Sequence, residues 1–170
     1  KIIATFIMGS RRLYDWLDRN PLVEMHPVSY TNNPAVIAQN RGMVAVNAAL
    51  EVDLLGQVCA DTLGTSQYSG VGGQVDFVRG ARLAEGGRAI IVLTSTARDG
   101  EVSRITPVLK TGAVVTTSRN DVDYVVTEYG AARLHGKTVR ERMRALIDVA
   151  HPKFREGLAR AAYDIYKVRL

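Results

Sequence analysis

The chain has 170 residues, 46% of them hydrophobic, and a formal net charge of +5 at pH 7. This length fits one domain spanning residues 1–170 with a sizeable core. No apolar run is long enough to span a bilayer, so no membrane partner is expected. Cys59 is the only cysteine, which excludes an internal disulfide and a cysteine-rich zinc site. We therefore expect a cytoplasmic protein without a bound metal.

Arginine supplies much of the positive charge, which raises the question of a nucleic-acid partner. No recognition motif and no alternation of basic with aromatic residues accompanies the charge. Arg140, Arg142 and Arg144 lie among Glu141 and Asp148, as on the solvated face of a helix. A small polyanionic ligand accounts for the charge equally well, and we do not expect nucleic acid to bind.

The first part of the chain mixes strand and helix signals. Ile2–Met8 is an apolar run typical of a buried strand. Asn33 followed by Pro34 is typical of a helix cap and a first helical residue. The expected elements are a strand at Ile2–Met8, a helix after Ser10 that ends at Asn20-Pro21, a helix from Pro34 to Gln39, and strands at Met43–Asn47, Ala49–Leu54 and Gly56–Ala60.

The rest of the chain continues this mixture. Ala89–Leu93 is a β-branched run typical of a strand covered on both faces. Thr138 and Glu141 form a capping-box pattern at the start of a helix. The expected elements are strands at Ala89–Leu93, Val102–Ile105, Ala113–Thr117 and Tyr124–Thr127, and helices at Gln74–Ala84, Thr138–Ala150 and Lys153–Tyr166. These elements predict an α/β fold in which helices flank a layered sheet.

The segment Tyr68–Phe77, which reads Y-S-G-V-G-G-Q-V-D-F, carries the strongest chemical signal. Gly70, Gly72 and Gly73 allow the chain to turn tightly and to bring bare N–H groups up to a ligand. The helix that follows adds its positive N-terminal end. The loop is therefore a candidate site for a phosphate or an oxyanion, with a purely structural turn as the alternative.

Two nucleotide-binding motifs fail on their spacing. A dinucleotide fingerprint, G-x-G-x-x-G, would require glycine where Val75 stands. A Walker A loop ending at Gly136-Lys137-Thr138 would require an earlier glycine where Ala131 stands.

Polar side chains outside the loop offer further candidates. Asn32 has an amide that can donate to a carbonyl or carboxylate. Glu128 ends a strand, where α/β folds place ligand contacts. Glu51 and Asp53 alternate on one strand. From spacing alone, an exposed carboxylate without a role is the simpler interpretation of all three acids. His151, before Pro152, is placed to cap helix carbonyls.

Several segments together resemble the C-terminal domain of the acetyl-CoA hydrolase/transferase family, and within it the 4-hydroxybutyrate CoA-transferases. The resemblance covers nearly the whole chain and implies the second of two α/β domains of the CoA-transferase type. The segments are Met8–Tyr14, Val28–Pro34, Asn47–Leu54, Tyr68–Phe77, Thr94–Gly100, Val126–Gly130 and Leu134–Lys137.

The resemblance implies covalent catalysis by a glutamate that attacks an acyl-CoA thioester and then carries CoA as a glutamyl thioester. In the family this glutamate lies in a G-x-H-x-E-like motif ahead of the segment that matches Met8-Gly9-Ser10. The chain has no such motif and starts with lysine. We therefore expect a C-terminal part whose catalytic glutamate and N-terminal domain lie outside it.

The resemblance also implies roles for single residues. Gly73 corresponds to the glycine whose N–H binds the thioester oxygen, Asn32 to an asparagine at the reacting carbonyl, and Glu128 to a second active-site carboxylate. Arg98 stands where the family usually has lysine, which keeps the charge and changes its geometry. The residues implied in binding CoA are Gly70, Val71, Gly72, Gln74 and Arg98.

The function implied is transfer of CoA between a short-chain acyl-CoA and a carboxylate such as acetate, butyrate or 4-hydroxybutyrate. CoA is then a substrate, with no permanently bound cofactor. The N-terminal domain of the same polypeptide is an expected partner, and a homodimer stays open. Two alternatives remain, an acyl-CoA hydrolase and a catalytically silent anion-binding module.

Overall fold

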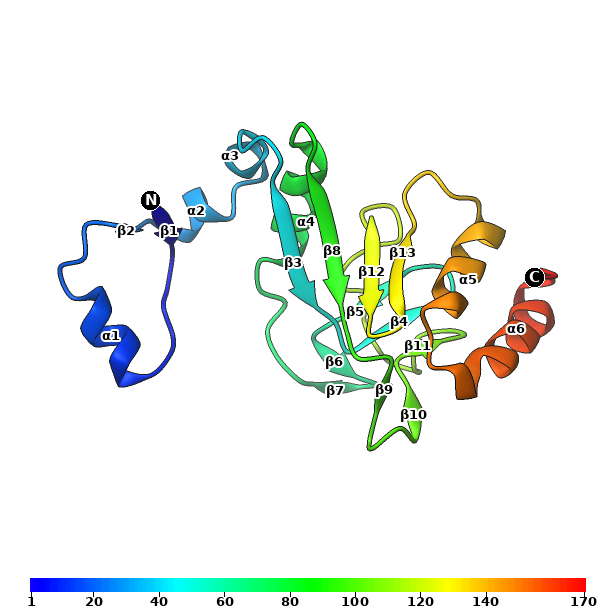
Figure 1. Ribbon diagram of the computed structural model, residues 1–170. Helices are drawn as coiled ribbons and strands as arrows, with labels where there is room; N and C mark the ends of the chain where they lie inside the picture. Colours follow the sequence, from blue (N-terminus) through cyan, green and yellow to red (C-terminus); the bar gives the residue numbers. More distant parts are fainter.

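The computed structural model describes residues 1–170, and its centre is a four-stranded sheet in the order β13-β12-β8-β3 (Figure 1). The strands β3 (Val44–Ala48), β8 (Arg88–Val92) and β12 (Tyr124–Thr127) are parallel, and β13 (Gly130–Arg133) is antiparallel to β12. Parallel strands end at the same edge of a sheet. We call the edge where β3, β8 and β12 end the carboxyl edge.

Helices flank this sheet, as the sequence predicts (Figure 1). The helix α3 (Pro34–Ala38) packs against α4 (Gln74–Leu83), and α4 packs against β3 and β8. The helix α5 (Val139–Asp148) packs against β13 and α6 (Pro152–Tyr166). The Asn33 side chain accepts from the N–H of Ala35, and Thr138 and Glu141 form the complete capping box. Both helix starts are therefore confirmed.

A second sheet of three strands lies beside the first. In it β4 (Glu51–Asp53) pairs in parallel with β11 (Ile105–Thr106) and antiparallel with β5 (Val58–Cys59). Two short hairpins complete the body, β6 (Thr62–Leu63) with β7 (Ser66–Gln67), and β9 (Thr96–Ala97) with β10 (Val102–Ser103). The strand expected at Gly56–Ala60 thus belongs to a separate sheet.

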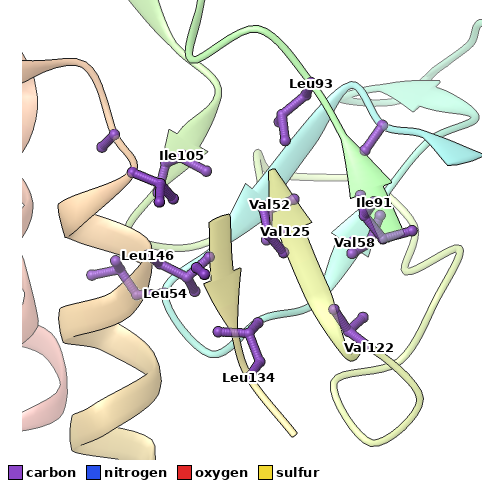
Figure 2. Close-up of a cluster of buried hydrophobic side chains, with 14 of the residues drawn as sticks. Val52, Leu54, Val58, Ile91, Leu93, Ile105, Val122, Val125, Leu134 and Leu146 are labelled. Carbon is purple, nitrogen blue, oxygen red and sulfur yellow. The ribbon is translucent and has the colours of Figure 1, made fainter. Parts of the chain in front are cut away.

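The hydrophobic core lies where the two sheets and α5 meet (Figure 2). Leu54, directly after β4, and Leu146 from α5 lie close to each other, and neither has exposed surface. Val125 of β12 and Leu134 after β13 are also fully buried. The core thus fixes the second sheet and α5 against the strands that form the carboxyl edge.

Replacing Leu54 with alanine is expected to lower the free energy of unfolding by about 2–5 kcal/mol, because it leaves a cavity in this core. Urea unfolding followed by circular dichroism measures the change. Leu83→Ala is the matched control, because Leu83 is 71% exposed. Equal losses for the two variants would show that Leu54 does not contribute to the core.

Residues 1–31, here called the N-terminal arm, lie apart from the sheets (Figure 1). The arm contains β1 (Ile2–Ala4), α1 (Arg11–Leu17), β2 (Val23–Met25) and α2 (Val28–Thr31), and none of its residues is buried. The prediction of a buried strand at Ile2–Met8 is wrong. The strand ends at Ala4, pairs only with β2 and is covered by no other layer.

The strand predicted at Ala113–Thr117 is also wrong. This stretch makes one isolated bridge, between Thr117 and Val58. Its threonines use their side chains instead: Thr116 Oγ1 donates to Asp61, and Thr117 Oγ1 donates to Gln74 Oε1 at 2.7 Å. Side-chain hydrogen bonds fix the stretch without a ladder.

Candidate active site

The glycine loop leaves a row of backbone donors free at the start of α4. None of the N–H groups from Gly70 to Asp76 donates a hydrogen bond within the chain. Gly72 has φ +59°, a conformation that glycine adopts at little cost, and Gly73 is the N-cap of α4. Val71 is exposed. These free donors and the positive end of the helix favour a bound anion or oxyanion.

Gln74 fastens this loop to the carboxyl edge. Its side chain is buried, its Nε2 donates to the carbonyl of Ala48 at 2.9 Å, and its Oε1 accepts from Thr117 Oγ1 at 2.7 Å. Ala48 is the last residue of β3. The amide therefore places the free N–H groups beside the end of that strand.

Replacing Gln74 with methionine is expected to lower the free energy of unfolding by about 1–3 kcal/mol, because the carbonyl of Ala48 and the hydroxyl of Thr117 lose their buried partner. Thermal unfolding followed by circular dichroism checks this. Gln39→Met, at the exposed C-cap of α3, is the control and should stay close to wild type. A Gln74→Met protein as stable as the control would contradict the anchoring role.

Asn32 lies directly against Gly73. An added Cβ at Gly73 would overlap the Nδ2 atom of Asn32. The Oδ1 of Asn32 accepts from the Thr31 hydroxyl at 2.9 Å, while its Nδ2 donates to no group in the chain. The structure therefore brings the amide donor of Asn32 beside the free N–H of Gly73, 41 residues later in the sequence.

Asn32 and Gly73 share a hollow of about 310 Å³ with Asn47, Phe77 and the start of the N-terminal arm. Asn47 was not singled out as a site residue from the sequence. It is the penultimate residue of β3, and its side chain makes no hydrogen bond within the chain. Its position at the end of a parallel strand, where α/β folds place ligand contacts, is the sequence signal that could have identified it.

Glu128 lies on the same carboxyl edge, directly after β12, but it does not line this hollow. Its strand is separated from β3 by β8, a distance of roughly 10 Å at ordinary strand spacing. Its carboxylate accepts from the hydroxyl and the N–H of Ser95. The structure therefore puts Glu128 on the same side of the sheet as Gly73 without contact between them.

Arg98 is exposed at the tip of the β9–β10 hairpin, which extends beyond the carboxyl edge (Figure 1). Its φ is +50°, and no carboxylate pairs with its guanidinium. The side chain is therefore free to meet an anion that approaches the edge, although nothing in the chain fixes its position.

Three other polar residues have structural roles that differ from the sequence-based interpretation. Glu51 and Asp53 are buried, where the Glu51 carboxylate accepts from the N–H of Lys110 and the Asp53 carboxylate from the N–H of Leu55. Burial raises the pKa of Asp53, against these hydrogen bonds. His151 caps the start of α6 by accepting from the Lys153 N–H, and does not cap carbonyls.

The hollow therefore combines an amide nitrogen, a free backbone N–H and a helix start, with a carboxylate further along the same edge. Donors arranged in this way stabilise negative charge on a carbonyl oxygen when a nucleophile attacks it. The hollow contains no Ser, Cys or Glu that is placed to be that nucleophile.

The family model for the acetyl-CoA hydrolase/transferase C-terminal domain matches residues 9–162. The 4-hydroxybutyrate coenzyme A transferase of Clostridium kluyveri is 63% identical over 158 residues, which cover 93% of this chain and 37% of that protein. The chain thus spans about a third of the length of this relative.

Solved structures of similar proteins have the same fold as this chain. The structure of RipA from Yersinia pestis is 44% identical with a TM-score of 0.92, and the match covers 98% of this chain and 37% of that one. The 4-hydroxybutyrate CoA-transferase of Porphyromonas gingivalis is 47% identical with a TM-score of 0.81, over 96% of this chain and 37% of that one. The α/β fold of CoA-transferase type is therefore confirmed.

No helix in the chain combines the length and the apolar character that crossing a membrane requires.

The match to the family model extends over most of the chain, and the fold and the relatives agree with it. The chain belongs to the acetyl-CoA hydrolase/transferase family and corresponds to its C-terminal domain.

Proposed function

We propose that this chain is the C-terminal domain of a CoA-transferase that moves CoA between a short-chain acyl-CoA and a carboxylate. The observation that carries the proposal is the pair of unused donors, Gly73 N–H and Asn32 Nδ2, beside each other in the hollow at the carboxyl edge. A transferase must stabilise the oxyanion that forms each time a thioester carbonyl is attacked. Two fixed donors that point at the developing charge do so effectively.

In this proposal the thioester carbonyl enters the hollow and its oxygen accepts from Gly73 and Asn32. The N–H groups of Gly70, Val71 and Gly72 and the cation of Arg98 hold CoA, while Gln74 keeps the loop in place through Ala48. Glu128 is a second carboxylate near the reacting groups. CoA is a substrate that leaves after each cycle.

The nucleophile of the proposed reaction is a glutamate in another part of the polypeptide. Its carboxylate attacks the thioester carbonyl and releases CoA thiolate, leaving an acyl-glutamyl anhydride. The thiolate then attacks the glutamyl carbonyl and releases the carboxylate product, which leaves a glutamyl-CoA thioester. The acceptor carboxylate then attacks the glutamyl-CoA thioester and releases CoA thiolate, which leaves a new acyl-glutamyl anhydride. The thiolate attacks the acyl carbonyl of this anhydride, forms the new acyl-CoA and releases the free glutamate.

The exposed apolar side chains of the N-terminal arm support a partner that covers it. Phe6 is 72% exposed and Met8 is 82% exposed, and Trp16 and Leu22 are also exposed. Apolar side chains gathered on one segment mark a surface that another part of a protein covers. We propose that the N-terminal domain of the same polypeptide packs against this arm and brings its glutamate to the hollow.

The test is an assay of the complete polypeptide with acetyl-CoA, in the presence and absence of butyrate, with chromatography of the CoA species. A transferase forms butyryl-CoA only when butyrate is present and releases little free CoA. Rapid release of free CoA without an acceptor would favour an acyl-CoA hydrolase. Absence of both products would contradict the proposed transfer and favour a silent anion-binding module.

A further inference from the structure

A single buried residue holds the carboxylate of Glu128. The hydroxyl of Ser95 donates to Oε1 at 2.5 Å, and the backbone N–H of Ser95 donates to Oε2 at 2.8 Å. Ser95 has no exposed surface, whereas Glu128 is exposed. Both oxygens of an exposed carboxylate are thus fixed by one residue from the neighbouring strand end.

The backbone around Ser95 is itself held in place. The N–H of Leu93 donates to the carbonyl of Val126 at 3.1 Å, which continues the β8–β12 ladder past the end of β8. The carbonyl of Ser95 accepts from the N–H of Arg104 at 2.9 Å. Ser95 is therefore a rigid support, and Glu128 cannot rotate without breaking both hydrogen bonds.

The hydrogen bonds from Ser95 also favour the charged form of Glu128. Desolvation raises the pKa of Glu128, whereas the side-chain and backbone hydrogen bonds from Ser95 lower it. The guanidinium of Arg155 lies 5.6 Å from the ring centroid of Tyr129, the residue that follows Glu128. The net effect is a pKa below the usual 4.5, so Glu128 is an anion at neutral pH.

We infer that Ser95 is a positioning residue that holds Glu128 as an oriented anionic acceptor at the carboxyl edge. The inference rests on the proposed function, in which Glu128 stands near the reacting groups. An ionised carboxylate accepts hydrogen bonds and cannot donate one. Each oxygen keeps acceptor capacity after Ser95 is bound, so Glu128 is suited to an N–H or O–H group of the substrate, and not to protonating a leaving group.

Carbon-13 NMR of the glutamate carboxyl carbons in the 170-residue chain tests the hold of Ser95 on Glu128. The Glu128 signal is assigned by its loss in Glu128→Gln and followed through a pH titration. We expect the midpoint for Glu128 to rise in Ser95→Ala, because one charge-assisted hydrogen bond is lost. Ser95→Cys keeps the size and a weaker donor, and should give a smaller rise.

Ser118→Ala is the matched control, since Ser118 is an exposed serine in the loop before β12. It should leave the Glu128 midpoint unchanged. The inference is overturned if the midpoint stays at the wild-type value in both Ser95 variants while circular dichroism shows them folded.

Activity of the complete polypeptide gives the second readout. Ser95→Ala is expected to lower kcat about tenfold, the factor expected for one lost hydrogen bond to a charged group. The same change in a Glu128→Gln background should have little further effect, because Ser95 acts through Glu128. Fully additive losses would overturn the inference and leave CoA transfer intact. If the wild-type enzyme does not transfer CoA, the proposed function fails, while the titration still decides whether Ser95 holds Glu128.

Discussion

The isolated 170-residue chain is expected to transfer CoA roughly 10⁶-fold more slowly than the complete polypeptide, the scale of loss when a covalent nucleophile is removed. The physical reason is that the hollow offers donors for an oxyanion but no carboxylate or thiol to attack the thioester. Formation of butyryl-CoA from acetyl-CoA and butyrate measures the rate for both proteins.

Circular dichroism of the isolated chain is the control, because an unfolded chain would be inactive for a trivial reason. Turnover close to that of the complete polypeptide would contradict the account. Glu128 would then be the first residue to test as the nucleophile, since it is exposed at the carboxyl edge whereas Glu51 is buried.

Gly73→Pro in the complete polypeptide is expected to lower kcat by roughly 10²–10³-fold, the loss measured when one oxyanion donor is removed. Proline lacks the backbone N–H, and the φ of −95° at Gly73 lies near the range that proline adopts. The affinity for CoA should change much less, because other parts of the loop hold CoA in the ground state. Steady-state kinetics and a separate CoA-binding titration distinguish the two effects.

Two alanine variants distinguish the loss of the Gly73 N–H from the steric effect of an added Cβ. Gly73→Ala keeps the N–H, while its Cβ meets the amide of Asn32 as the proline Cβ does, so the ratio of kcat between Gly73→Ala and Gly73→Pro isolates the loss of the N–H. Gly157→Ala, in α6, adds a Cβ in open space and should behave like wild type. If Gly73→Pro and Gly73→Ala reduce kcat equally, the N–H of Gly73 does not bind the oxyanion.

Local sequence signals predicted the elements whose cause is local. The Asn33-Pro34 pair and the Thr138–Glu141 capping box begin helices through hydrogen bonds between residues two or three positions apart. The β-branched run at Ala89–Leu93 corresponds to β8, one of the two inner strands of the four-stranded sheet. Each of these patterns lies within one segment, so the local sequence alone predicts the helix or strand.

Other elements depend on distant partners. The strand β13 consists of Gly130-Ala131-Ala132-Arg133, which has little strand propensity and forms through its pairing with β12. The apolar run at Ile2–Met8 has the pattern of a buried strand, yet within this chain no layer covers it. In both segments the structure depends on residues elsewhere in the protein, and not on the sequence of the segment alone.

The candidate site shows the same division. The glycine loop is visible in the sequence because three glycines precede a helix, and that helix begins at Gln74 as predicted. The contact of Asn32 with Gly73 and the pairing of Ser95 with Glu128 join residues 41 and 33 positions apart. No local pattern encodes these contacts, and the parallel sheet brings the strand ends together.

A crystal structure of the complete polypeptide with an acyl-CoA analogue would test the central claim most directly. The analogue keeps the carbonyl and replaces the thioester sulfur with a methylene group, so that it is not cleaved. We predict a carbonyl oxygen about 3 Å from both Gly73 N and Asn32 Nδ2, the ordinary length of such hydrogen bonds. A carbonyl bound away from this hollow, with other groups donating to its oxygen, would contradict the account.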